Sequence, residues 1–128
     1  MNSIRVQKAS GKFQQEITVG RHRLIADVDL ASGGEDAGPS PHDLLASALG
    51  ACTAITVQMY AQRKAWPVEN VDVTVTLDKE GEVTKLHRKI QLIGALDQQQ
   101  RERLLAIANQ CPVHKTLSGK IEIATSLV

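Results

Sequence analysis

The chain has 128 residues, a length that suits one domain with a single hydrophobic core. Its formal net charge of +1 predicts no strong electrostatic attraction to DNA, RNA or an anionic membrane, so neither nucleic acid nor a membrane is expected as a partner. Only 2% of the residues are aromatic, which leaves little material for stacking bases and requires an aliphatic core.

The first part of the chain predicts three short strands. Apolar and polar residues alternate over 4–8, over 13–19 and over 24–30, and Gly20 with Arg21 marks a turn between the second and third of these segments. Residues 31–41 are rich in glycine, proline and acidic side chains and therefore predict a loop.

A long helix is predicted from Ser40 to about Lys64. Ser40 is a suitable N-cap, Pro41 fits the first helical position, and Asp43 can complete a capping box. Residues 44–57 are apolar or small on nearly every face, which predicts a helix that is covered on more than one side. This run is shorter than the ~20 apolar residues of a membrane span, so we expect a core helix.

The second part of the chain predicts a β-hairpin and a final strand. Residues 71–77 and 86–92 alternate strictly between apolar and polar side chains on either side of a turn, and residues 121–127 alternate in the same way. With a second helix before the last strand, the order is βββ–α–ββ–α–β. This order favours an α+β fold with mainly antiparallel pairing, in one domain that covers residues 1–128.

Two cysteines are the residues best suited to chemistry. Cys52 lies deep in the long helix. Asp97 predicts the start of the second helix, and Pro112 disfavours helix at the residue before it, so Cys111 is expected at the C-terminal end of that helix. Residues 1–12 contain no signal peptide, so we expect a cytoplasmic location, where a transient redox pair fits better than a permanent disulfide.

Helix position suggests different roles for the two thiols. The negative end of a helix dipole destabilises a thiolate, so Cys111 suits a thiol that resolves a sulfenic acid better than one that attacks. Cys52 lies about three turns into its helix and gains little from the N-terminal dipole. It therefore needs a cation from elsewhere. The sequence does not choose among the candidate cations, which are Lys12, Arg21, Arg23 and Arg63.

Two other interpretations of the cysteines stay open. Free cysteine is among the most buried residue types, so inert packing in the core explains the same residues. Cys111 and His114 have the spacing of a metal-binding pair, with Cys52 and His42 as remote ligands, although structural zinc sites use four ligands from tight pairs. The histidines other than His42 are expected on solvated faces or in turns.

Two motifs of the chain resemble the OsmC/Ohr family of osmotically inducible and organic hydroperoxide resistance proteins. The first is GPSPHDLLA at residues 38–46, followed by Ala51 and Cys52. The second is CPVHKTL at residues 111–117, before the last predicted strand. Residues 22–67 are especially similar to a generic OsmC-like branch, and the resemblance covers nearly the whole chain.

The resemblance implies an intertwined α+β homodimer and a cysteine-based peroxidase that needs no cofactor and no metal and prefers organic hydroperoxides. Cys52 matches the family's peroxidatic cysteine and Cys111 its resolving cysteine. The Cys52 thiolate would attack the peroxide bond and become a sulfenic acid. Cys111 would condense with it to a disulfide, and an external dithiol would restore both thiols.

The chain departs from the hydroperoxide-resistance members at two places. It has His42 where those members carry a glutamate, and Asp43 is the nearest carboxylate. In the first strand–turn region it has Lys12 where they carry a catalytic arginine, with Arg21 and Arg23 further along. Because lysine lacks the guanidinium fork, the alternative function is a redox-sensing or small-ligand-binding protein without efficient peroxidase turnover.

Overall fold

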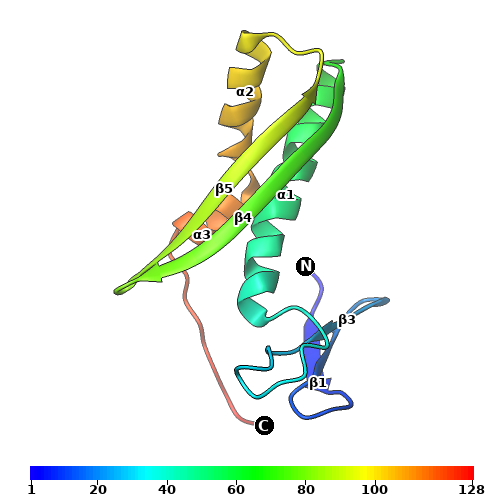
Figure 1. The fold of residues 1–128 in the computed structure, drawn as a ribbon, viewed down its shortest axis with the longest axis vertical. Coiled ribbons are helices and arrows are strands. Elements are labelled where there is room, and N and C mark those ends of the chain that lie inside the picture. The colour runs from blue at the N-terminus through cyan, green and yellow to red at the C-terminus, as the bar shows by residue number, and fades with distance from the viewer. The chain divides into compact units, whose positions relative to one another are not determined.

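The computed structural model describes residues 1–128 as two compact units, residues 1–45 and residues 46–128. The first unit contains a three-stranded antiparallel sheet with the order β1-β2-β3 (Figure 1). Its strands are β1 (Ile4–Lys8), β2 (Gln15–Val19) and β3 (His22–Ala26). The predicted turn between β2 and β3 is confirmed, and its Gly20 has a φ of 57°, a conformation that glycine adopts without steric cost.

Strand β3 ends where Asp27 organises the loop that follows. The buried carboxylate of Asp27 accepts hydrogen bonds from the backbone N–H groups of Val28, Glu35 and Ala37 at 2.8, 3.3 and 3.0 Å. The bond from Ala37 contributes most to holding the pKa of Asp27 below its usual value, against the opposing effect of burial. Because the loop backbone bonds to this carboxylate rather than to a strand, the predicted continuation of β3 to Leu30 is wrong.

Helix α1 (Pro41–Arg63) begins with the predicted capping box. The Ser40 N–H donates to Asp43 Oδ2, and the Asp43 N–H donates to Ser40 Oγ, each at 3.1 Å. With 23 residues, α1 is also long and apolar enough to cross a membrane by length and composition alone, a test that core helices of soluble proteins pass as well.

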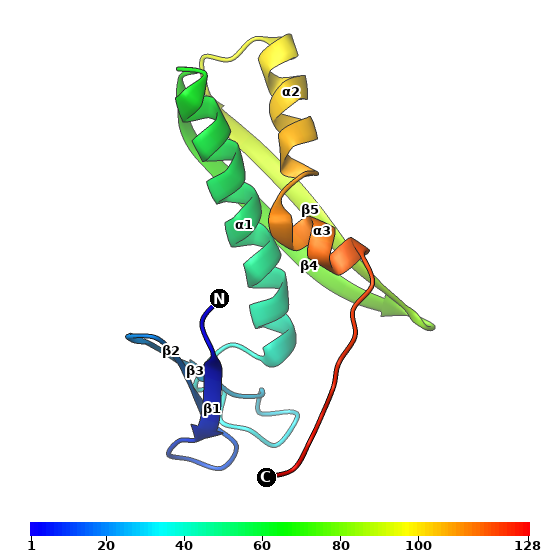
Figure 2. The ribbon, with the colours of Figure 1, turned by 180° about the vertical axis from the view of Figure 1, so that it is seen from behind.

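In the second unit, α1 and a further helix pack on one face of a long β-hairpin (Figures 1 and 2). The hairpin consists of β4 (Val68–Glu80) and β5 (Val83–Gly94), and the helices that follow are α2 (Gln98–Ala108) and α3 (Pro112–Ser118). The predicted capping box of α2 is confirmed, with Asp97 as N-cap and Gln100 at the third position. The core between these elements consists of Val57, Ala61, Val71, Leu104 and Ala108.

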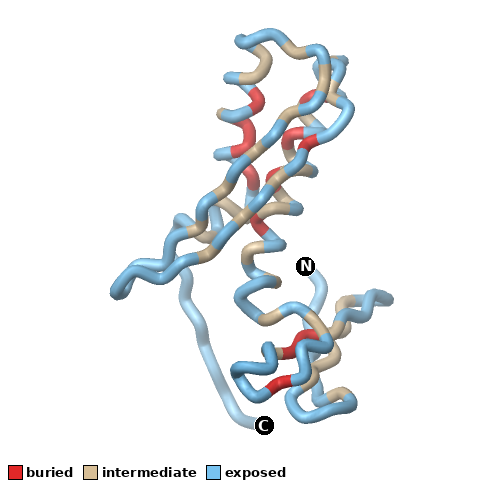
Figure 3. The backbone as a smooth tube through the Cα atoms, viewed as in Figure 1, coloured by how far each residue is buried: buried red, intermediate tan, exposed pale blue.

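Only one face of α1 is covered within the single chain (Figure 3). Its buried residues recur every four positions and are Leu49, Thr53, Val57 and Ala61. On other faces, the side chains of Ile55 and Met59 are 57% and 60% exposed. The prediction that α1 is covered on more than one side is wrong for the single chain, because the hairpin and α2 lie on the same side of it.

The chain after α2 departs from prediction in two ways. Pro112 begins α3 instead of following a helix end, since proline needs no N–H partner in the first turn. Cys111 is therefore the N-cap of α3, and its predicted place at the end of α2 is wrong. Residues 121–127 form no strand, because no segment of the same chain pairs with their backbone, so the predicted last strand is also wrong. The predicted α+β class with antiparallel sheets is confirmed.

Candidate functional site

The candidate site lies in the second unit, around the guanidinium group of Arg88 on β5. Side chains alternate between the two faces of a strand, and Arg88 falls in the same register as Leu86, Ile90 and Leu92. Ile90 and Leu92 pack against the core under α1 and α2. The register therefore directs one positive charge into the apolar face of the hairpin.

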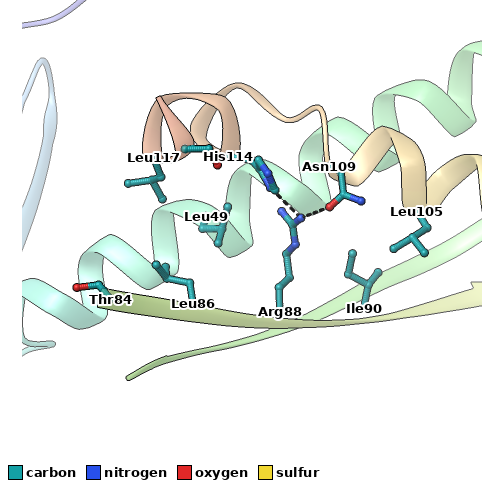
Figure 4. Close-up of a pocket in the computed structure, with 10 residues that line it drawn as sticks. Leu49, Thr84, Leu86, Arg88, Ile90, Leu105, Asn109, His114 and Leu117 are labelled. Atoms are coloured by element: carbon teal, nitrogen blue, oxygen red, sulfur yellow. Dashed lines mark hydrogen bonds between the residues drawn. The ribbon is translucent and has the colours of Figure 1, made fainter. Parts of the chain in front are cut away.

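Every hydrogen bond that Arg88 makes ends on a neutral group, and Figure 4 shows the two that reach Asn109 and His114. Its Nη1 donates to Thr53 Oγ1 at 3.0 Å and to the Ala108 carbonyl at 3.4 Å. Its Nη2 donates to Asn109 Oδ1 at 2.8 Å and lies 3.0 Å from His114 Nδ1. Because a guanidinium can only donate, Nδ1 of His114 is the acceptor, and the ring is assigned as neutral with its hydrogen on Nε2.

Cys111 is connected to Arg88 through Thr53. Cys111 and Thr53 have no exposed surface. The Cys111 sulfur lies 3.8 Å from Thr53 Oγ1 and accepts the backbone N–H of His114 at 3.3 Å. The Thr53 hydroxyl hydrogen is given to the Leu49 carbonyl at 2.7 Å, and its oxygen accepts from Arg88. The positive charge is thus one hydroxyl group away from the buried sulfur.

These contacts shift the acidity of Cys111. Burial raises the pKa of the thiol, because it penalises the charged form. The hydrogen bond from the His114 backbone, the contacts with Thr53 and Cys52, and the positive charge of Arg88 act in the opposite direction and hold the pKa of Cys111 below its ordinary value. The low pKa of Cys111 therefore depends on these neighbours, which outweigh the effect of burial.

Cys52 precedes Thr53 on α1 and has a different environment. It is half-buried, and its sulfur has Thr56 Oγ1 as a hydrogen-bonding neighbour at 3.9 Å. It interacts with Cys111 closely enough to help lower the pKa of that thiol, and both cysteines are free. The fold thus brings together two thiols that are far apart in the sequence.

An open pocket of about 510 Å³ adjoins Arg88 (Figure 4). Its polar end is formed by Arg88, Asn109 and His114. The rest of its lining is mainly aliphatic and consists of Leu49, Leu86, Ile90, Leu105 and Leu117, with Thr84 and Ser118. Neither cysteine is among the lining residues, so in the single chain the pocket leads to the polar cluster that surrounds Cys111.

The other charged residues singled out from the sequence lie elsewhere. Lys12, Arg21, Arg23 and Asp43 belong to the first unit, and their role toward Cys52 stays a prediction. There, Lys12 Nζ lies 5.4 Å from the centre of an aromatic ring, and Asp43 is engaged in the capping box of α1. Arg63 belongs to the second unit, but its guanidinium lies over the Tyr60 ring at 5.7 Å.

Sequence reasoning missed three residues of the site, namely Thr53, Arg88 and Asn109. Arg88 did carry a signal, since it is the one charge in the apolar register of β5. His114 was expected on a solvated face or in a turn, and that prediction is wrong, because the residue is half-buried beside Arg88. The zinc interpretation finds no support in the structure, which has no group of three or more His, Cys, Asp or Glu residues able to hold a metal.

The lowered pKa of Cys111 should make the reduced protein more stable as pH rises. The folded state loses this proton first, so the unfolded state binds more protons between the folded pKa and the ordinary thiol pKa of 9.0. The free energy of unfolding should increase across that window, level off above it, and lose this contribution as pH falls through the folded pKa. Urea unfolding at a series of pH values with a phosphine reductant measures the free energy of unfolding.

The cysteine variants are the controls for this pH dependence. The increase in stability with pH should be absent from Cys111→Ser and retained in part by Cys52→Ser. An identical increase in Cys111→Ser would contradict the assignment of the lowered pKa to Cys111.

Residues 33–126 match the family described as OsmC-like protein. A Psychrobacter arcticus protein described as an osmotic stress induced and detoxification response protein superposes with a TM-score of 0.78 at 21% identity, over 91% of this chain and 88% of that one. An OsmC-like protein of Mycoplasma pneumoniae superposes with a TM-score of 0.74 at 18% identity, over 93% of this chain and 88% of that one. An organic hydroperoxide resistance protein, OsmC, of Legionella pneumophila superposes with a TM-score of 0.68 at 22% identity, over 93% of this chain and 90% of that one. No curated protein matches the chain.

Proposed function

The chain belongs to the OsmC-like protein family, and on that premise we propose that it is a thiol peroxidase that reduces organic hydroperoxides. The observation that carries the proposal is the contact series from Arg88 through Thr53 to Cys111, with Cys52 beside it. A buried thiol one hydroxyl group away from a cation without a carboxylate partner, with a second thiol nearby, suits peroxide reduction, because the thiolate is the reactive form of cysteine.

In this proposal, Cys52 is the peroxidatic cysteine, since it is the more accessible of the two thiols. Its thiolate attacks the terminal peroxide oxygen, an alcohol leaves, and a Cys52 sulfenic acid remains. Cys111 condenses with the sulfenic acid to form a disulfide and water. An external dithiol then restores both thiols and is itself oxidised to a disulfide.

The pocket supports an organic peroxide as substrate. Its aliphatic lining favours a substrate with an apolar body, through the burial of apolar surface. Its polar end presents Arg88 and Asn109, which can orient the oxygen atoms of a hydroperoxide or stabilise the charge that develops on the leaving oxygen. Hydrogen peroxide would use only the polar end and should therefore be the poorer substrate.

Peroxide consumption by the purified protein tests the function. With cumene hydroperoxide and dithiothreitol, the intact protein should turn over many equivalents of peroxide, and more slowly with hydrogen peroxide. Cys52→Ser should abolish turnover. Without dithiothreitol, Cys111→Ser should consume one equivalent of peroxide per chain and hold a sulfenic acid at Cys52, detectable by dimedone labelling and intact mass. An intact, reduced protein that consumes no peroxide would refute the proposal.

A second function, redox sensing or small-ligand binding without turnover, is favoured by one observation. Both terminal nitrogens of Arg88 already bond to protein groups, and neither cysteine lines the pocket. A protein of this kind would form the Cys52–Cys111 disulfide once with peroxide but show no continuous turnover with dithiothreitol. The same assay therefore separates the two functions.

We also propose that the protein is a homodimer. Two exposed apolar surfaces would be buried by a second copy of the chain. They are the face of α1 that carries Ile55 and Met59, and the unpaired C-terminal segment with Ile121 and Ile123. Light scattering after size-exclusion chromatography should give twice the chain mass. Ile55→Glu should shift the protein to a monomer, whereas Gln58→Glu, at an exposed polar position of the same helix, should not. A monomeric intact protein at micromolar concentration would contradict the proposal.

A further inference from the structure

The second unit carries a cluster of positive charges where the C-terminal end of α1 lies beside α2 (Figures 1 and 2). The centre of this cluster is the ring of Tyr60. The charged groups of Arg63, Lys64 and Arg103 lie 5.7, 5.7 and 5.4 Å from the centre of that ring. Three positive charges are therefore gathered within 5.7 Å of one point, although the net charge of the whole chain is only +1.

No carboxylate of the chain pairs with the three cations of this cluster. The two ion pairs of the structure involve other residues. Glu102, the residue before Arg103, accepts a hydrogen bond from Gln98 at 3.2 Å instead. Like charges that are held close together repel one another, and the face of one aromatic ring offsets only part of this repulsion. Because all three cations are exposed, an anion from solution can reach them and neutralise them.

The hydroxyl group of Tyr60 adds a hydrogen-bond donor to the cluster. Arg103 Nε donates to Tyr60 Oη at 2.9 Å, and the hydroxyl hydrogen itself has no acceptor in the chain. The bond from Arg103 contributes most to holding the pKa of Tyr60 below its ordinary value of 10.0, against the opposing effect of burial. Trp66 meets the Tyr60 ring edge-on at 5.7 Å, and both rings pack against the core. The ring that gathers the cations is therefore held in place.

We propose that the cluster around Tyr60 binds a ligand that carries two linked phosphate groups. Guanidinium groups match phosphate oxygens two at a time, so Arg63 and Arg103 can each hold one phosphate, and Lys64 adds a point charge. Two linked phosphates also carry enough negative charge and enough acceptor oxygens to engage all three cations and the Tyr60 hydroxyl, whereas a single carboxylate does not. The site shares no residue with the cluster around Arg88, so it is independent of the proposed peroxidase function.

Titration of the reduced, intact protein with inorganic pyrophosphate tests the proposal. Trp66 is the only tryptophan of the chain and contacts Tyr60, so its fluorescence should change on binding, and isothermal titration calorimetry should give one saturable site per chain. ADP, titrated in the same way without divalent cations, distinguishes two sources of the phosphates. Tighter binding of ADP would identify a nucleoside diphosphate, and equal or weaker binding would identify a free diphosphate. A pyrophosphate titration without saturable binding would overturn the proposal.

Three variants locate the bound anion. Arg103→Gln should weaken pyrophosphate binding by about 10-fold, because it removes a charged donor to phosphate. Tyr60→Phe keeps the ring and removes only the hydroxyl, so its loss of affinity should be smaller. Lys89→Gln removes one positive charge from an exposed position on β5 and should leave the affinity unchanged. Equal losses in Arg103→Gln and Lys89→Gln would mean that net charge alone attracts the anion, which would overturn the proposal.

Ionisation of Tyr60, the only tyrosine of the chain, gives a second readout. Bound pyrophosphate would place negative charge beside the phenol and should raise its pKa, so phenolate absorbance should appear at higher pH than in the free protein. A Tyr60 titration that is unchanged at saturating pyrophosphate would place the anion elsewhere and overturn the proposal. Neither measurement uses peroxide or a thiol, so a failure of the peroxidase assay would leave this result unaffected.

Discussion

Replacement of Arg88 by methionine should lower kcat/KM for cumene hydroperoxide by on the order of 100-fold, the loss found when one stabilising donor is removed from an enzyme site. Methionine keeps the length and the apolar stem of the side chain but removes the positive charge and all its N–H donors. Thr53, Asn109 and His114 then lose their shared partner. Peroxide consumption at limiting cumene hydroperoxide and excess dithiothreitol, with far-ultraviolet circular dichroism to confirm folding, measures the effect.

Two further variants define what Arg88 contributes. Lys89→Met removes a charge from the adjacent, exposed position of β5 and should leave kcat/KM unchanged. Arg88→Lys keeps the charge but cannot bond Thr53 and Asn109 at once through a planar fork, so its activity should fall between the intact protein and Arg88→Met. If Arg88→Met retained full activity, the activating cation would have to come from another residue, and Lys12, Arg21 and Arg23 would be the candidates.

The parts of the fold that follow from local patterns could be predicted from the sequence. The capping box at Ser40 and the one at Asp97 depend on side chains three residues away, and the hairpin of β4 and β5 depends on period-two alternation around a tight turn. In each case the residues that decide the structure lie close together in the chain. Both helices begin where expected, whereas β4 (Val68–Glu80) and β5 (Val83–Gly94) extend beyond the predicted segments 71–77 and 86–92.

The errors arise where distant or competing contacts decide. Residues 121–127 have the pattern of a strand, but a strand needs a partner, and no neighbour within the chain supplies one. Pro112 can follow a helix or begin one, and the backbone N–H of His114 bonding to Cys111 shows that it begins α3. That single reassignment moves Cys111 from the negative end of one helix to the start of another and reverses the expected effect on its acidity.

Only part of the site could be predicted from the sequence. Two free thiols in one small chain were easily singled out, and the fold does bring Cys52 and Cys111 together. Arg88 was not among the candidate cations, because those named from the sequence, which are Lys12, Arg21, Arg23 and Arg63, all lie outside β5. A charged residue in the apolar register of a strand, such as Arg88, is costly unless the interior supplies acceptors. That cost makes an inward arginine a stronger indication of a polar site than an arginine on a solvated face.

Replacement of Leu104 by alanine should destabilise the second unit by about 2–5 kcal/mol, the usual cost of removing a large buried aliphatic side chain. Leu104 on α2 is 1% exposed and packs with Val57 of α1 and Val71 of β4, so its loss leaves a cavity among three elements that hold the site together. Urea unfolding of the reduced protein at fixed concentration measures the change in free energy.

Leu105→Ala is the matched control for this substitution, since Leu105 is the next residue of α2 and its side chain is 56% exposed. It should cost about 0.5 kcal/mol or less in stability. Leu105 also lines the pocket beside Arg88, so its removal should raise KM for cumene hydroperoxide while kcat changes little. Leu104→Ala should show the opposite pattern, with a large loss of stability and an unchanged KM below its unfolding transition. Equal losses of stability in the two variants would mean that α2 packs with its other face toward the hairpin, and the cluster around Arg88 could not then form as described.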